Sequence, residues 1–169
     1  MSRTNPVKTN FFTSPFFLSI TVGVPFCIYK ILFGILAIRV GGRSQEVLLT
    51  SFGVMVILWA SADLFLNIIR ALYDVAGKIS FSEFCTLAQL GRICKASTVF
   101  LALDTLLTFI IICFILWSGW VMHFIGYESY LWYFATTLNL ISLSLVGLWT
   151  ELIRLKGQNI TDDGYNGNK

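Results

Sequence analysis

The chain has 169 residues, of which 56% are hydrophobic and only 12% are charged, and its mean hydropathy is +0.77. Ordinary soluble domains carry about 25% charged residues, so this composition excludes a typical water-soluble domain and indicates an integral membrane protein. The net charge of +3 is small and lies mainly in the tails and one loop, which argues against a nucleic-acid-binding surface.

Four apolar stretches are each long enough for a membrane helix of about 20 residues. They predict an all-α integral membrane protein with one domain, a four-transmembrane-helix antiparallel bundle. The expected spans are about 15–39, 47–75, 97–122 and 130–153. Residues 1–14 form a polar cytoplasmic tail, and the polar residues 156–169 form a cytoplasmic tail that we expect to be disordered.

The first apolar run is too long for the core of a signal peptide, so we expect it to remain in the protein as a span. Pro25 has no N–H to donate to the carbonyl of Thr21, which predicts a kink. The sequence Gly41-Gly42-Arg43-Ser44 predicts a tight turn into the second span.

The second span carries a polar stripe at one end. Asp63, Asn67, Arg70 and Asp74 are spaced so that they share one helix face. An intramembrane charge costs at least about 2.5 kcal/mol on insertion scales, so this face requires partners from other spans. Asp104 in the third span is expected at a similar depth to Asp63.

Lys30, Asp63, Arg70 and Asp104 together would form a neutral buried cluster, with Asn67 beside it. In this interpretation Arg70 neutralises the two carboxylates. Lys30 is the weakest member, because its Cα is expected roughly 10 Å from Asp63 along the membrane normal. The cluster has two readings: ionic contacts that hold helices together, or a path for protons or ions.

The cytoplasmic loop 76–96 contains Ser80 and Glu83, which match a capping box and predict a short interfacial helix from about Ser80 to Lys95. The fourth span contains Thr137, Ser144 and Glu151 at seven-residue spacing. This spacing predicts a second polar seam that faces the bundle, with Glu151 near Arg154 at the inner surface.

Basic residues indicate the orientation, because they gather on the cytoplasmic side of membrane proteins. With both termini inside, nine basic residues are cytoplasmic and two, Arg39 and Arg43, are outside. We therefore expect a multi-pass protein of the inner or plasma membrane.

No pattern for a cofactor or metal is found. The four cysteines lack CxxC spacing and are expected to be structural, and the single histidine, His123, has no partner ligands for haem or zinc. Motifs for catalysis are also missing, so no catalytic residue is assigned.

The sequence therefore favours a non-enzymatic subunit or assembly factor of a membrane complex, whose partners are the lipid bilayer and either itself or other membrane subunits. The alternative is an oligomeric ion or proton channel, or a small-solute carrier, that uses the intramembrane Asp, Arg and Lys residues. An enzyme acting on lipid or quinone is the third possibility.

Overall fold

The computed structural model describes residues 15–76, 85–93 and 95–166, and all regular structure within them is helical. Four segments are long and apolar enough to cross a membrane: Phe16–Ser44, Val47–Val75, Ser97–Trp117 and Gly126–Leu155. The all-helical class and the four candidate spans are thus confirmed. Helix α3 (Val47–Val75) has the same bounds as the predicted second span.

The first long segment consists of α1 (Pro15–Leu18), the π-helical turn η2 (Ser19–Gly23) and α2 (Val24–Ser44). The Val24 N–H donates to the carbonyl of Ser19, five residues back. Pro25 has no N–H to donate to the carbonyl four residues back, and its ring would clash with that carbonyl in a regular α-helix. The wider π turn leaves room for the ring. The predicted irregularity at Pro25 therefore takes the form of a π turn.

Helix α2 continues through Gly41-Gly42-Arg43-Ser44, so the turn predicted there is wrong. The chain reverses at Gln45 instead, which adopts a left-handed conformation with φ 58°. Gly41 is a packing residue, because a Cβ at this position would lie 2.6 Å from Thr50 Oγ1 of α3.

Close packing of α2 on α3 also depends on Gly34 and Gly53. A Cβ on Gly34 would lie 2.8 Å from the Gly53 carbonyl oxygen, and a Cβ on Gly53 would lie 2.7 Å from that of Gly34. Small residues at such positions let two helix backbones approach closely. Asp74, near the end of α3, accepts a hydrogen bond of 2.9 Å from the Phe16 N–H at the start of α1.

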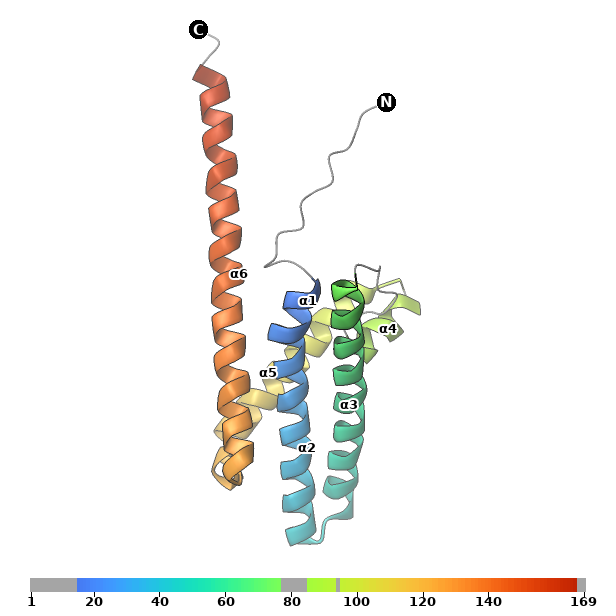
Figure 1. The fold of residues 1–169 in the computed structure, drawn as a ribbon. Coiled ribbons are helices and arrows are strands. Elements are labelled where there is room, and N and C mark those ends of the chain that lie inside the picture. The colour runs from blue at the N-terminus through green and yellow to red at the C-terminus, as the bar shows by residue number, and fades with distance from the viewer. Residues whose placement is uncertain (1–14, 77–84, 94, 167–169) are drawn as a thin grey trace.

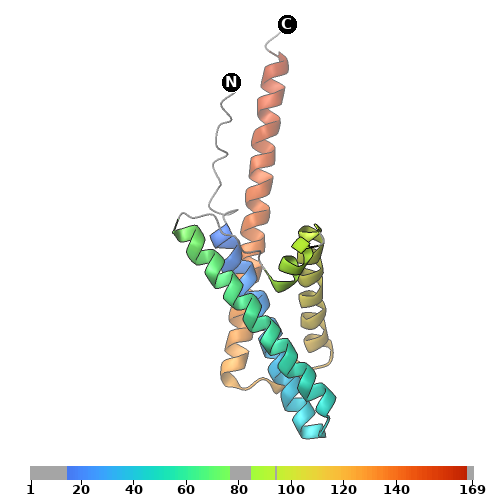
Figure 2. The same cartoon turned by 90° about the vertical axis from the view of Figure 1, so that its right-hand side faces the viewer.

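Helix α2 lies at the centre of the structure and packs against α3, α5 (Ser97–Trp117) and α6 (Gly126–Asn166). Successive long helices run in opposite directions (Figure 1), and α3 and α6 lie on different sides of α2 (Figures 1 and 2). The core is rich in aromatic side chains from α2: the rings of Tyr29 and Trp132 meet edge to face at 5.1 Å.

A short helix, α4 (Thr86–Ile93), lies between α3 and α5 in the chain. It packs mainly on α5, where a Cβ on Gly91 would lie 2.7 Å from the Phe100 Cβ. Ser80 and Glu83 of the predicted capping box lie outside the described residues.

The third span ends at Trp117, before the position 122 that was predicted. Gly119, with φ 72°, and the 3-10 helix η3 (Trp120–His123) then connect it to α6. Helix α6 begins at Gly126, ahead of the predicted 130, and remains helical to Asn166, through residues that we expected to be disordered. Once a helix is nucleated, each added residue gains one backbone hydrogen bond, so α6 can continue beyond the part that packs on α2.

Candidate functional site: a buried ionic centre

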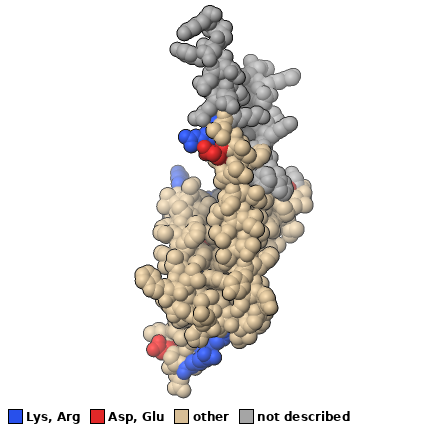
Figure 3. Space-filling model, turned by 90° about the vertical axis from the view of Figure 1, so that its left-hand side faces the viewer, with Lys and Arg blue, Asp and Glu red and all other residues tan. Residues whose placement is uncertain are grey.

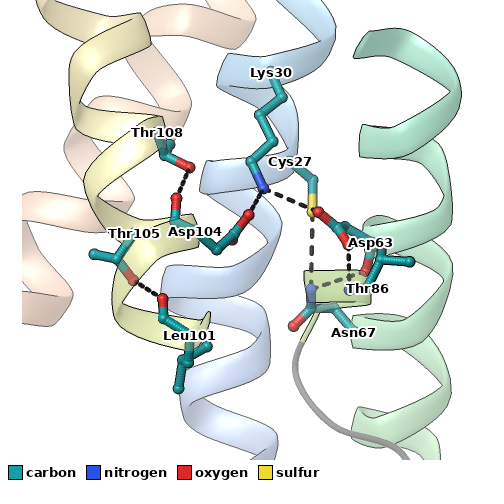
Figure 4. Close-up of polar contacts among 9 residues, drawn as sticks. All are labelled: Cys27, Lys30, Asp63, Asn67, Thr86, Leu101, Asp104, Thr105 and Thr108. Atoms are coloured by element: carbon teal, nitrogen blue, oxygen red, sulfur yellow. Dashed lines mark hydrogen bonds and ion pairs between the residues drawn. The ribbon is translucent and has the colours of Figure 1, made fainter. Parts of the chain in front are cut away.

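Lys30 of α2 lies between two carboxylates from two other helices. Its Nζ atom is 2.9 Å from Asp63 Oδ2 of α3 and 2.5 Å from Asp104 Oδ1 of α5 (Figure 4). The exposed fraction of the side chain is 1% for Lys30, 1% for Asp63 and 7% for Asp104. We call these three residues the ionic centre. It joins three of the four long helices through one amine.

The ionic centre lies near the middle of the helices that form it. Lys30 is the midpoint of Phe16–Ser44, Asp63 is two residues past the midpoint of Val47–Val75, and Asp104 is three residues before the midpoint of Ser97–Trp117. At about 1.5 Å per residue these offsets are below roughly 5 Å. No bridging water is needed to bring Lys30 to Asp63, since the Lys30 amine contacts the Asp63 carboxylate directly.

Asp63 also holds the start of α4. Its Oδ1 atom accepts hydrogen bonds from the Thr86 backbone N–H, at 2.7 Å, and from the Thr86 hydroxyl. A carboxylate at this position satisfies a donor that a helix N-terminus leaves unpaired and complements the positive end of the helix dipole. The first turn of α4 is therefore anchored at the depth of the ionic centre.

Asn67 lies one turn beyond Asp63 on the same face of α3. Its Nδ2 atom donates to the Asp63 carbonyl oxygen at 2.9 Å and approaches Cys27 Sγ at 3.8 Å. Its Oδ1 atom is buried and has no hydrogen-bond partner among the described residues. That amide faces η2 at Gly23, where any Cβ would overlap it.

A cavity of about 200 Å³ adjoins the ionic centre. Both carboxylates, the Lys30 amine, Asn67 and Thr105 contribute to its wall, as do the thiols Cys27 and Cys85. The rest of the described lining is apolar and includes Leu18, Val22, Phe26 and Leu101. The ionic groups thus face a space large enough for several water molecules, since one water occupies about 30 Å³ in the liquid.

Arg70 is not the cation of this centre, contrary to the expectation from the sequence. Among the described residues, Lys30 is the basic group that pairs with Asp63 and Asp104. Arg70 lies seven residues beyond Asp63, roughly 10.5 Å along α3, and is half-buried there. The intervening turn is occupied by Asn67. The centre therefore holds one formal positive charge and two formal negative charges.

Two contacts of Lys30 and Asp104 complete the environment. The Lys30 Nζ atom lies 4.6 Å from the ring centroid of Trp59, a cation–π distance. The Thr108 hydroxyl donates to the Asp104 backbone carbonyl at 2.9 Å. Trp59 stands four residues before Asp63 in α3, so helical spacing could have identified it from the sequence. No local pattern identifies Thr86, because its contact is formed only by the tertiary fold.

The predicted second seam lies on the wrong face of α6. Thr137, Ser144 and Glu151 are exposed, and Glu151 lies 3.8 Å from Arg154 as expected. The buried face instead includes Glu128, Trp132, Ala135, Asn139 and Ser142. Polarity did not identify the inward face, because both faces of α6 carry polar residues. The inward face is the one that contacts α2 and η2. One such contact is the hydrogen bond of 2.6 Å that Ser142 Oγ donates to Thr21 Oγ1 of η2.

A second ion pair, which is partly buried and which the sequence did not predict, joins the end of α2 to the start of α6. Arg39 contacts both carboxylate oxygens of Glu128, at 3.0 Å and 2.6 Å, and also donates to the His123 carbonyl at 2.8 Å. Glu128 has no exposed surface and also accepts the Ile125 N–H at 2.9 Å. The bidentate geometry fixes the relative position of the two helix ends.

Within the described part of the chain, no group of three or more His, Cys, Asp or Glu side chains is arranged to hold a metal ion. Comparison with known proteins adds no relative: no family model matches the chain, and neither a curated protein nor a solved structure matches it.

Proposed function

We propose that the four long helices cross the cell membrane as an antiparallel bundle, with both termini in the cytoplasm. The face of α6 in Figure 3 supports insertion, because a broad band without Lys, Arg, Asp or Glu separates charged residues at the two ends. Large apolar side chains are exposed along α3, α5 and α6, where lipid would cover them more favourably than water. The distribution of basic residues supports the orientation.

We propose further that the protein is a small carrier or channel that binds a proton at the ionic centre during transport. The observation that carries this proposal is the charge of the centre: one amine faces two buried carboxylates. A bare negative charge in the middle of a membrane is costly, so the site favours one further positive charge. The adjoining cavity gives water, and with it a proton, access to both carboxylates. No enzymatic step is proposed.

The test is proton flux in liposomes that contain the purified protein, followed with a pH-sensitive dye. Asp104→Asn is the informative variant, because it leaves Lys30 and Asp63 as a neutral pair and preserves the Asp63 contacts to α4. We expect this variant to fold and to lose the flux. Glu46→Gln, which changes an exposed carboxylate outside the centre, is the matched control and should keep the flux. Equal flux in both variants would rule out the proposal.

A non-enzymatic subunit of a membrane complex is the second candidate. The observation that favours it is that Asp63 connects α2 and α4 through three hydrogen bonds, one from the Lys30 amine and two from Thr86, as a purely structural contact would. In that case wild-type protein in liposomes would give no flux above protein-free liposomes, and a partner subunit would co-purify in mild detergent.

A further inference from the structure

Helix α6 has two faces with a seven-residue repeat. The inner face packs on α2 and η2 and includes Trp132, Ala135, Asn139 and Ser142. The second face, which we call the outer stripe, is exposed along its whole length and consists of Tyr130, Thr137, Leu140, Ser144, Gly147 and Glu151. Ser144 follows Ser142 by two residues, about 200° around the helix, so the outer stripe points away from the rest of the chain.

The outer stripe has a composition that suits another helix better than lipid. Thr137, Ser144 and Gly147 are small or polar, and a Cβ on Gly147 would meet nothing within 4 Å. Positions 137, 140, 144, 147 and 151 of the stripe alternate by three and four residues. This is the spacing of the seam of a left-handed helix pair, in which small residues allow close approach.

Charge identifies what would cover this stripe. At its end Glu151 and Arg154 lie one turn apart, 3.8 Å from each other, and their side chains are 57% and 69% exposed. A second copy of the chain would insert into the membrane in the same orientation, because it carries the same distribution of basic residues. Two α6 helices would therefore pair in parallel about a two-fold axis. Each acid then lies within one turn of the base of the other copy, and the stripe complements itself.

The length of α6 is an independent argument for a partner helix. It is 41 residues long and continues past the level at which α1 and α3 end (Figure 1). A helix in water gains little stability from propensity alone and is stabilised mostly by packing. No other described element of the chain packs beside this extension in Figure 1 or Figure 2.

We propose that the protein forms a parallel homodimer through the outer stripe of α6, in which the two stripes face each other about a two-fold axis and Glu151 of each copy contacts Arg154 of the other. The proposal depends on the membrane insertion proposed above and is independent of the ionic centre. A dimer would place one ionic centre in each copy, away from the interface, because α2 lies on the opposite side of α6.

Cysteine cross-linking in native membranes tests the dimer, with the four native cysteines replaced by serine or alanine. Under mild oxidation, Ser144→Cys should shift from 19.0 kDa to about twice that mass on a non-reducing gel. Leu145→Cys is the matched control: this residue is also exposed but lies about 100° around the helix, so it should stay monomeric. Equal cross-linking at the two positions, or none at Ser144→Cys, would overturn the proposal.

A charge exchange tests the register. In the Ser144→Cys background, Glu151→Arg should abolish the shift, because it brings four arginines together across the axis. Glu151→Arg combined with Arg154→Glu should restore it. Failure of the double variant to restore cross-linking would rule out the parallel register. Neither result tests the proton flux of the wild type, which is measured separately in liposomes.

Discussion

Thr86 donates both its backbone N–H and its hydroxyl to a single carboxylate oxygen of Asp63. The other oxygen of the same carboxylate contacts the Lys30 amine. One side chain in the middle of α3 thus fixes a lysine on α2 and the N-terminus of α4. Any change in the charge of the ionic centre therefore acts directly on the first turn of α4.

Thr86→Val should loosen α4. The variant keeps the backbone donor and removes the hydroxyl, and a hydrogen bond to a charged group is worth about 1.5–3 kcal/mol. We expect a loss within this range in detergent unfolding and faster amide exchange in residues 86–93. Thr105→Val is the control, since the Thr105 hydroxyl bonds only to the Leu101 carbonyl of its own helix. Equal destabilisation by both changes would contradict the role of Thr86.

Lys30→Met should destabilise the protein by about 3–5 kcal/mol, because it leaves two buried carboxylates without their cation. Lys30→Met combined with Asp104→Asn should recover part of this loss, since only one carboxylate then remains. Thermal unfolding of the single and double variants in one detergent measures the coupling. Strict additivity would show that Lys30 and Asp104 do not form a pair in the folded protein.

Arg70→Ala provides the comparison for this cycle. Because Lys30 and not Arg70 contacts Asp104, the effects of Arg70→Ala and Asp104→Asn should add to within about 0.5 kcal/mol. The same unfolding measurement applies. A coupling as large as that of Lys30 would restore the arginine-centred cluster that the sequence pattern predicted.

Gly53→Ala should weaken the contact of α2 with α3, because the added Cβ would lie 2.7 Å from the Gly34 carbonyl oxygen. Overpacking of this kind costs about 1–3 kcal/mol. Gly42→Ala is the control in the last turn of α2, where the Cβ meets nothing within 4 Å and alanine favours the helix. Detergent unfolding should show a lower Tm for Gly53→Ala only.

Arg39→Lys should not replace the native arginine. A lysine has no planar fork for the two Glu128 oxygens, and weakening a buried charge pair costs about 2 kcal/mol or more. Arg43→Lys, at an exposed position in the last turn of α2, should leave the Tm unchanged. If Arg39→Lys also unfolds at the wild-type Tm, the bidentate pair does not hold the end of α2 to α6.

The sequence by itself determined the helical class, the four apolar segments and the exact extent of the second one. These follow from local chemistry, because apolar length and helical spacing do not depend on neighbouring elements. The same spacing placed Asp63 and Asn67 on one face, and the sequence marked Asp104 as an acid within the third apolar segment. Lys30 was recognised as a candidate for the same reason.

Only the tertiary structure decided which cation meets these carboxylates and which face of α6 is buried. Arg70 and Lys30 were both available to Asp63, and the choice depends on how α2 packs against α3. The Arg39–Glu128 pair and the Thr86 contact join residues 89 and 23 positions apart. Such contacts carry no local signal, because they depend on how the helices pack and not on the order of residues within any one of them.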